Sequence, residues 1–151
     1  MSEAHLKPVL VSACLLGQAC RYDGRDSLRT ILVERLTAEG FRPVPFCPEE
    51  AGGLGTPRPA AWIERGDAQQ VLDGHAAVVT HAGDECTEAF RSGADQALEL
   101  CREESIERAY LKEGSPSCGV CQTHVDGERV DGPGVTAAHL ARSGIEVHGV
   151  D

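Results

Sequence analysis

The chain has 151 residues, is 41% hydrophobic and carries a formal net charge of −10. This length is typical of one domain with a real core, so we expect a single domain over residues 1–151. A strongly acidic chain repels other polyanions, which argues against extended RNA or DNA as a partner, whereas one local basic group can still hold a small anionic ligand.

Targeting signals and cysteine content indicate the compartment. No apolar run reaches the roughly 18 residues of a membrane helix, and the polar residues 1–7 are too short for a signal peptide. We therefore expect a cytoplasmic protein with no membrane partner. Seven cysteines, an odd number, do not fit a disulfide framework. In a reducing compartment they indicate metal or thiol chemistry, unless some are simply small buried residues.

Strands and helices alternate in the first half of the chain. The apolar run over residues 8–13 predicts a buried strand. We expect Ser27 to cap a helix that ends at Gly40, because the apolar residues between them recur at helical spacing. A short strand is expected over residues 41–46, although its two prolines are unusual in a strand.

The turn-rich segments that follow these strands carry reactive side chains. Residues 14–24 include two cysteines, and residues 47–59 are too rich in glycine and proline for a regular element. We expect the second segment to be an ordered functional loop.

The alternation continues in the second half. Residues 62–72 predict a small hairpin or irregular arm that turns near Gly66, and residues 76–80 predict another buried strand. Thr87 is expected to cap a helix whose apolar stripe includes Cys101. The remaining expected elements are a strand over 106–111, a loop through 126–134, a helix over 135–142 and a strand over 145–150. This order predicts an α/β fold: a single-domain, Rossmann-like, mostly parallel sheet with helices on both faces.

Three cysteines follow predicted strands of this sheet. Cys14 comes after the first strand, Cys47 after the second, and Cys118 after the strand over 106–111 in a stiff turn that also carries Ser115. Because the carboxyl ends of parallel strands meet at one edge, we expect the three thiols to converge. Three thiolates suit a soft metal centre and leave one position of a four-site centre open.

Other cysteines leave alternatives open. Cys20 lies close enough in sequence to Cys14 to serve as a spare ligand. Cys118 and Cys121 form a C-x-x-C pair, which also occurs in thiol oxidoreductases and zinc sites. Cys101 is expected in the core and Cys86 in a structural position. Two alternative functions follow: a zinc-stabilised binding or regulatory module, and a thiol oxidoreductase.

Several motifs in fixed order resemble those of the thiouracil desulfidase family over nearly the whole chain. They are Cys14-Leu15-Leu16-Gly17, Cys20-Arg21-Tyr22-Asp23-Gly24, Cys47-Pro48-Glu49, Gly52-Gly53-Leu54, Thr56-Pro57-Arg58-Pro59, Leu111-Lys112-Glu113, Ser115-Pro116-Ser117-Cys118-Gly119 and Gly132-Pro133-Gly134-Val135-Thr136-Ala137. The resemblance implies an enzyme that converts a thiolated pyrimidine, thiouracil or its nucleotide, to the oxo base and sulfide without net redox change.

The resemblance also implies a cofactor and a set of site residues. A [4Fe-4S] cluster would be held by Cys14, Cys47 and Cys118, with its fourth iron free for the thiocarbonyl sulfur. Glu49 and Ser115 would be the catalytic acid/base pair.

Three further residues are candidates for contact with the substrate: Arg21, Arg58 and Ser117. Arg21 binds substrate or locks the first loop. Arg58, held stiffly between two prolines, suits a base carbonyl, a phosphate or a structural salt bridge. The chain departs from the family pattern at residues 60–62 and 120–124, and we expect these segments to affect which substrate is accepted.

Overall fold

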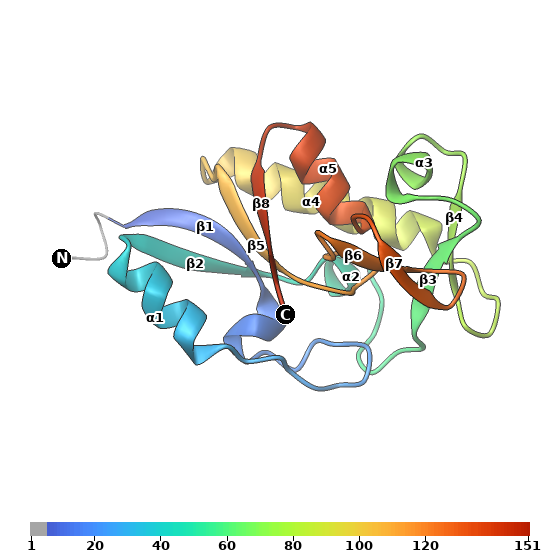
Figure 1. Ribbon diagram of the computed structural model, residues 1–151, viewed down its shortest axis with the longest axis horizontal. Helices are drawn as coiled ribbons and strands as arrows, with labels where there is room; N and C mark the ends of the chain where they lie inside the picture. Colours follow the sequence, from blue (N-terminus) through green and yellow to red (C-terminus); the bar gives the residue numbers. More distant parts are fainter. Residues whose placement is uncertain (1–5) are drawn as a thin grey trace.

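The computed structural model describes residues 6–151, so most of the N-terminal segment considered above lies outside the described residues. Its main sheet, sheet A, has four parallel strands in the order β2-β1-β5-β8 (Figure 1). The predicted parallel α/β sheet is thereby confirmed. The strands of sheet A are β1 (Lys7–Ser12), β2 (Phe41–Phe46), β5 (Arg108–Lys112) and β8 (Glu146–Val150).

Helices cover both faces of sheet A, as predicted. Alternation along β1 directs Val9 and Val11 toward a cluster with Leu36 of helix α1, and Leu10 toward a cluster with Leu98 of α4 and Leu140 of α5. Figure 1 shows α1 on one side of the sheet and α4 and α5 on the other. These helices are α1 (Thr30–Ala38), α4 (Thr87–Glu103) and α5 (Val135–Arg142).

A second sheet, sheet B, was not predicted. Its order is β4-β3-β6-β7, with β3 antiparallel to β4 and parallel to β6. The strand expected over 76–80 therefore belongs to this sheet, and part of the loop expected over 126–134 is the second strand of the β6–β7 hairpin. The strands of sheet B are β3 (Ala61–Glu64), β4 (Ala77–Thr80), β6 (Gln122–Val125) and β7 (Glu128–Asp131).

Residues 62–72 form neither a hairpin nor an irregular arm. Strand β3 leads into helix α3 (Ala68–Leu72), which starts at a capping box between Asp67 and Gln70. The capping box satisfies the amides at the start of α3, and so favours a helix where the second strand of a hairpin was expected. Strand β3 pairs instead with β4, which follows α3, on one side and with β6, some sixty residues later in the chain, on the other.

Three helix starts also differ from the predictions. Helix α1 begins at Thr30 after Arg29, and the Ser27 hydroxyl accepts from Arg21 rather than capping the helix. Thr87 is the first residue of α4 rather than its cap, and Cys86 takes the cap position. A short helix, α2 (Pro48–Ala51), interrupts the segment expected to be irregular.

The two prolines of β2 are compatible with its position at the edge of sheet A. Pro43 and Pro45 pair with Val9 and Val11 of β1, so both occupy alternate positions of the same strand. An edge strand needs ladder hydrogen bonds on one side only, so two missing amides can be accommodated there.

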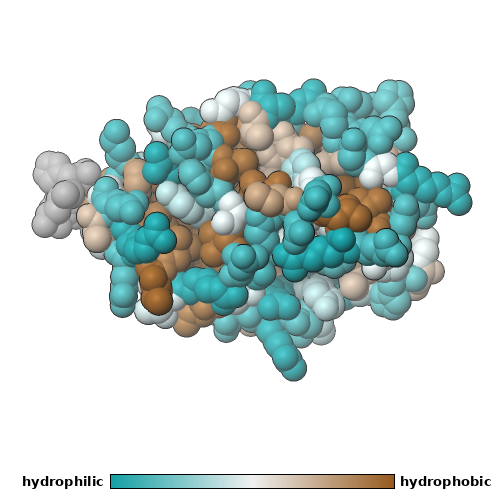
Figure 2. Space-filling view, viewed as in Figure 1, coloured by the Kyte–Doolittle hydropathy of each residue, from teal (hydrophilic) through white to brown (hydrophobic). Residues whose placement is uncertain are grey.

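The surface seen in Figure 2 is mainly hydrophilic, with hydrophobic residues in separate small areas. The exposed large hydrophobic residues of the described chain are Tyr22, Leu28 and Ile31. None of the helices within residues 6–151 is long and apolar enough to cross a membrane.

Candidate active site

A cavity of about 440 Å³ lies where strands β1, β2 and β5 end. It is lined by Cys14, Cys47 and Cys118, the three predicted ligands, and also by Cys20. The parallel order of sheet A explains the convergence, because all of its strands end at the same edge. The remaining wall includes residues of sheet B.

The loop after β1 places Cys14 in a 3₁₀ turn, η2 (Ala13–Leu16). The Ser27 amide donates to the Cys14 carbonyl at 2.8 Å, which folds the loop back onto this turn. Arg21 donates through Nη1 to the Ser27 hydroxyl at 2.9 Å and pairs with Asp23 at 3.2 Å. Arg21 thus locks the loop internally while it also lines the cavity.

Helix α2 positions Cys47 and Glu49. Cys47 occupies its N-cap and Pro48 its first turn, where proline is tolerated because it has no amide to satisfy. The helix lies against α4 at a distance that two glycines permit. A Cβ on Gly93 would lie 2.1 Å from the Pro48 carbonyl oxygen, and one on Gly52 would lie 2.0 Å from the Ala89 carbonyl oxygen.

The turn after β5 is held by main-chain contacts with α5. The first amides of α5 donate to the carbonyls of Pro116 and Ser117, with Val135 and Thr136 as donors at 2.8 and 2.9 Å. The Ser115 hydroxyl accepts from the amides of Ser117 and Cys118, both at 3.1 Å. The backbone that carries the Cys118 thiol is therefore fixed by hydrogen bonds on both sides of the turn.

Glu113 fixes the segment that follows this turn. Its carboxylate accepts hydrogen bonds from the amides of Val120, Cys121 and Gln122 at 2.8 to 3.2 Å. Burial raises the pKa of Glu113, but the amide hydrogen bonds outweigh burial, and the net pKa is lowered.

Glu49 is the centre of a polar network in the cavity. Its Oε2 accepts from Ser117 at 2.8 Å and from Ser115 at 3.3 Å, and the two serine hydroxyls lie 2.9 Å apart. Its Oε1 accepts from Arg58 Nε at 3.1 Å. Ser117 is 1% exposed and connects Ser115 with Glu49. The structure thus brings the predicted acid/base pair together.

The guanidinium of Arg58 is occupied by the protein itself. Besides Glu49, it donates to the carbonyls of Cys20 at 2.9 Å and Gly55 at 3.1 Å, and to the Thr56 hydroxyl at 2.9 Å. Its side chain is 8% exposed. This geometry fits an orienting ion pair for Glu49, the structural alternative raised from the sequence.

The thiols around the cavity differ in acidity. The neighbouring Cys20 thiol is the largest influence on both Cys14 and Cys47: its hydrogen bond lowers the pKa of Cys14 to about 7 and lowers that of Cys47, but its single S–H can be donated to only one of them at a time. Donation of this hydrogen raises the pKa of Cys20. Burial raises the pKa of Cys118 to about 12.

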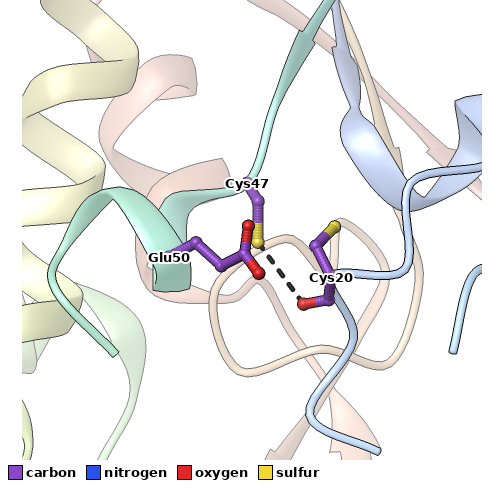
Figure 3. Close-up of side chains that lie close together, drawn as sticks. All are labelled: Cys20, Cys47 and Glu50. Atoms are coloured by element: carbon purple, nitrogen blue, oxygen red, sulfur yellow. Dashed lines mark hydrogen bonds between the residues drawn. The ribbon is translucent and has the colours of Figure 1, made fainter. Parts of the chain in front are cut away.

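This donor set is chemically suited to a soft metal centre. The Cys20 and Cys47 sulfurs and a Glu50 carboxylate oxygen lie within 4.8 Å of one another, and the Cys47 thiol lies 3.7 Å from the Cys20 carbonyl oxygen (Figure 3). With Cys14 and Cys118 on the same cavity, four sulfur donors are available.

The other three cysteines lie outside this cavity. Cys101 is buried in the core of sheet A, as expected. The Cys86 thiol donates to the Val78 carbonyl at 3.6 Å, a structural contact. Cys121 is exposed, whereas its C-x-x-C partner Cys118 is buried.

Two lining residues, Trp62 and His124, had no predicted role. Trp62 comes from β3 and His124 from β6, so both depend on the unpredicted sheet B. The signal that could have found them is the departure from the family pattern at residues 60–62 and 120–124, which include both positions.

Comparison with known proteins identifies the family. Residues 9–151 match the family model described as 2-thiouracil desulfurase. The chain belongs to the 2-thiouracil desulfurase family. This confirms the family predicted from the motifs, and it does not favour the zinc module or the thiol oxidoreductase.

Individual members of the family are similar along almost their full length. The protein YbbK of Bacillus subtilis (strain 168) is 38% identical over 146 residues, which cover 92% of this chain and 93% of YbbK. A solved structure of the [4Fe-4S]-dependent thiouracil desulfidase TudS is 44% identical, with a TM-score of 0.80; the match covers 95% of this chain and 90% of TudS.

Proposed function

We propose that this protein hydrolyses the thiocarbonyl group of a thiolated pyrimidine, thiouracil or its nucleotide, to the oxo base and sulfide. Water supplies the oxygen that replaces sulfur, and its two hydrogens leave with the sulfide, so no electrons are exchanged. One observation carries the proposal: in a member of the 2-thiouracil desulfurase family, Cys14, Cys47 and Cys118 converge on the cavity that holds Glu49.

The cofactor of this reaction is a [4Fe-4S] cluster, on which the similar enzyme TudS depends. In our proposal Cys14, Cys47 and Cys118 hold it. A cluster held by three cysteines supplies a thiophilic iron that polarises the C=S bond as a Lewis acid. Two of these cysteines have a lowered pKa in the protein, which favours the thiolate form that binds metal.

Glu49 and the two serines move the protons. Arg58 holds one carboxylate oxygen of Glu49, so the other oxygen is directed at the serines and the cavity. Glu49 accepts a proton from the attacking water, and Ser117 and Ser115 relay a proton to the substrate, because their hydroxyls form a continuous chain from Glu49. In this arrangement Arg58 orients the base, and Arg21 keeps the Cys14 loop closed beside the substrate.

The setting of the reaction follows from composition and packing. We infer that the enzyme acts on a small molecule rather than on extended nucleic acid, because the chain carries a net charge of −10. We infer that it acts in the cytoplasm, because its seven free cysteines fit a reducing compartment. We also infer that residues 1–151 form one desulfidase domain, because α4 contributes to the cores of both sheets.

The test is anaerobic purification of the full chain followed by metal analysis and assays with thiouracil and its nucleotide. We expect a brown protein with about four irons per chain and loss of the thiocarbonyl absorbance of the substrate. Cys47→Ala should lose cluster and activity, whereas Cys86→Ala, outside the cavity, should keep both. A colourless protein, or a Cys47→Ala variant with full cluster and activity, would contradict the proposal.

A further inference from the structure

Sheet B contributes a wall to the cavity that the proposed reaction does not yet use. Trp62 of β3 and His124 of β6 both line the cavity that the three cysteines share. Strand β6 is bonded to the turn after β5 at two further points: the Gly114 amide donates to the Gln122 carbonyl, and the Thr123 hydroxyl donates to the Ser115 carbonyl. The wall is therefore fixed relative to the catalytic serines.

The hydrogen bond of His124 defines its tautomer. Its Nδ1 lies against the carbonyl oxygen of Gly114. A carbonyl oxygen can only accept, so Nδ1 must carry the hydrogen, and in the neutral ring Nε2 then carries a lone pair. Within residues 6–151, no hydrogen bond engages His124 Nε2. His124 thus presents a free acceptor among the cavity-lining residues.

Trp62 supplies an aromatic surface next to this acceptor. The turn between β6 and β7 packs on its ring, and a Cβ added to Gly127 would lie 3.8 Å from Trp62 Cη2. The turn thus covers part of the ring and holds it as a rigid side of the cavity. Planar pyrimidines stack on aromatic side chains without regard to their exocyclic groups, so Trp62 alone offers affinity but little discrimination.

From these observations we propose that sheet B is the substrate-recognition wall of the enzyme: His124 Nε2 accepts the ring N–H of a thiouracil, and Trp62 stacks on its ring. This rests on the proposed function and names its specificity. A uracil-type ring has a hydrogen on N3, between its two carbonyl positions, whereas a cytosine-type ring has a lone pair there. A lone pair facing Nε2 is repelled, so His124 selects thiouracils over thiocytosines.

The test compares two substrates that differ only at N3 and the neighbouring C4 substituent of the ring. In 1-methyl-2-thiouracil and 1-methyl-2-thiocytosine, N1 is blocked and cannot substitute for N3. We expect the cluster-loaded wild type to have at least a tenfold higher kcat/KM for the uracil compound, about the value of one neutral hydrogen bond. His124→Phe should remove this preference, and so should His124→Gln, because its amide can turn to present either an acceptor oxygen or a donor N–H to the ring nitrogen. His75→Phe, an exposed histidine outside the cavity, is the matched control.

Two measurements are independent of turnover. Calorimetric titration with 1-methyluracil and 1-methylcytosine should show the same preference and the same dependence on His124, and Trp62→Leu should weaken both bases about tenfold. Long-range ¹H–¹⁵N spectra should show the Nδ1–H tautomer of His124. If calorimetry shows the preference while no thiouracil is desulfurated, the recognition wall stands and the proposed reaction fails. Equal binding of both bases, an unchanged preference in His124→Phe, or the Nε2–H tautomer overturns the inference.

Discussion

Two segments each bring a cysteine to the cavity, and they are held in different ways. The turn that carries Cys118 is fixed by main-chain contacts with α5 and by the Glu113 carboxylate. The loop that carries Cys14 folds onto itself through main-chain bonds such as that from Ser27 to Cys14, and two arginines add side-chain contacts, Arg21 to Ser27 and Arg58 to the Cys20 carbonyl. Both follow central strands of sheet A, so the strand order alone does not explain the difference.

The difference indicates which half of the site is the fixed reference. Main-chain contacts between secondary-structure elements leave little freedom, whereas a long, partly exposed side chain such as Arg21 can exchange its partners. We infer that the Cys118 turn keeps its shape when the cluster is absent, and that the Cys14 loop changes its conformation when the cluster binds. Substitutions in the turn should therefore cost more stability than substitutions in the loop.

The largest effect is expected from Gly119→Ala in the turn. The new Cβ would lie 1.9 Å from the Gln122 carbonyl oxygen, so the backbone must move. We expect the cluster-free chain to lose at least about 3 kcal/mol in free energy of unfolding, measured by denaturant titration. Gly55→Ala, where no atom lies within 4 Å of the added Cβ, should be close to neutral. Equal stabilities of the two variants would show that the turn can move to accommodate the new Cβ and is not the fixed reference of the site.

Glu113→Gln should have the next largest effect, about 2 kcal/mol at neutral pH, because three amides lose a charged acceptor. The folded-state pKa of Glu113 is lowered from its ordinary value of 4.5, so its contribution is present above that pH and is lost as the pH falls through the folded-state pKa. The stability difference between wild type and Glu113→Gln should therefore shrink below pH 4.5. A difference that stays constant down to strongly acidic pH would exclude the charge as its cause.

Arg58→Lys tests the side-chain contacts of the loop. Lysine keeps the charge but cannot reach Glu49, the Cys20 carbonyl and the Gly55 carbonyl together. We expect a loss of about 1.5 kcal/mol in unfolding free energy and, because Glu49 loses its orienting partner, a lower kcat with little change in KM. Arg91→Lys, in an exposed pair with Glu88, serves as the control and should behave as wild type.

The smallest effect is expected from Ser27→Ala, about 1 kcal/mol. Only the hydroxyl that accepts from Arg21 is removed, and the Ser27 amide keeps its bond to the Cys14 carbonyl. Thermal unfolding of the two proteins side by side measures this difference. A loss as large as that of Glu113→Gln would show that the loop is as tightly fixed as the turn.

The sequence predicted sheet A because its strands are apolar runs bounded by clear turns. From those strand ends it also predicted the convergence of Cys14, Cys47 and Cys118 on one edge. It did not predict sheet B, because β3 has only four residues, helix α3 separates it from its partner β4, and its other partner β6 lies far along the chain. The hairpin signal was nevertheless present: Asp126-Gly127 separates β6 from β7, and both residues have positive φ, which is typical of a tight hairpin turn.

The positions of Trp62 and His124 in the cavity could not be predicted from the sequence, because both depend on sheet B. Periodicity assigns a residue to a face of its own strand but does not say which distant strand lies beside it. Helix α2 was missed for a related reason, since four residues are too few to show helical periodicity. Its stability comes from contact with α4 at Gly52 and Gly93, which only the folded chain provides.

Helix α4 has a consequence for how the active site could be altered. None of the cavity-lining residues within the described chain comes from α4, yet it contacts both α2, which carries Glu49, and α5, which holds the Cys118 turn. The spacing between Glu49, the proposed base, and Cys118, a proposed metal ligand, is therefore set by a helix that does not line the cavity. Changes at Gly93 would shift Glu49 and Cys47 together relative to Cys118. The width of the cavity could therefore be adjusted by substituting a residue that does not line it.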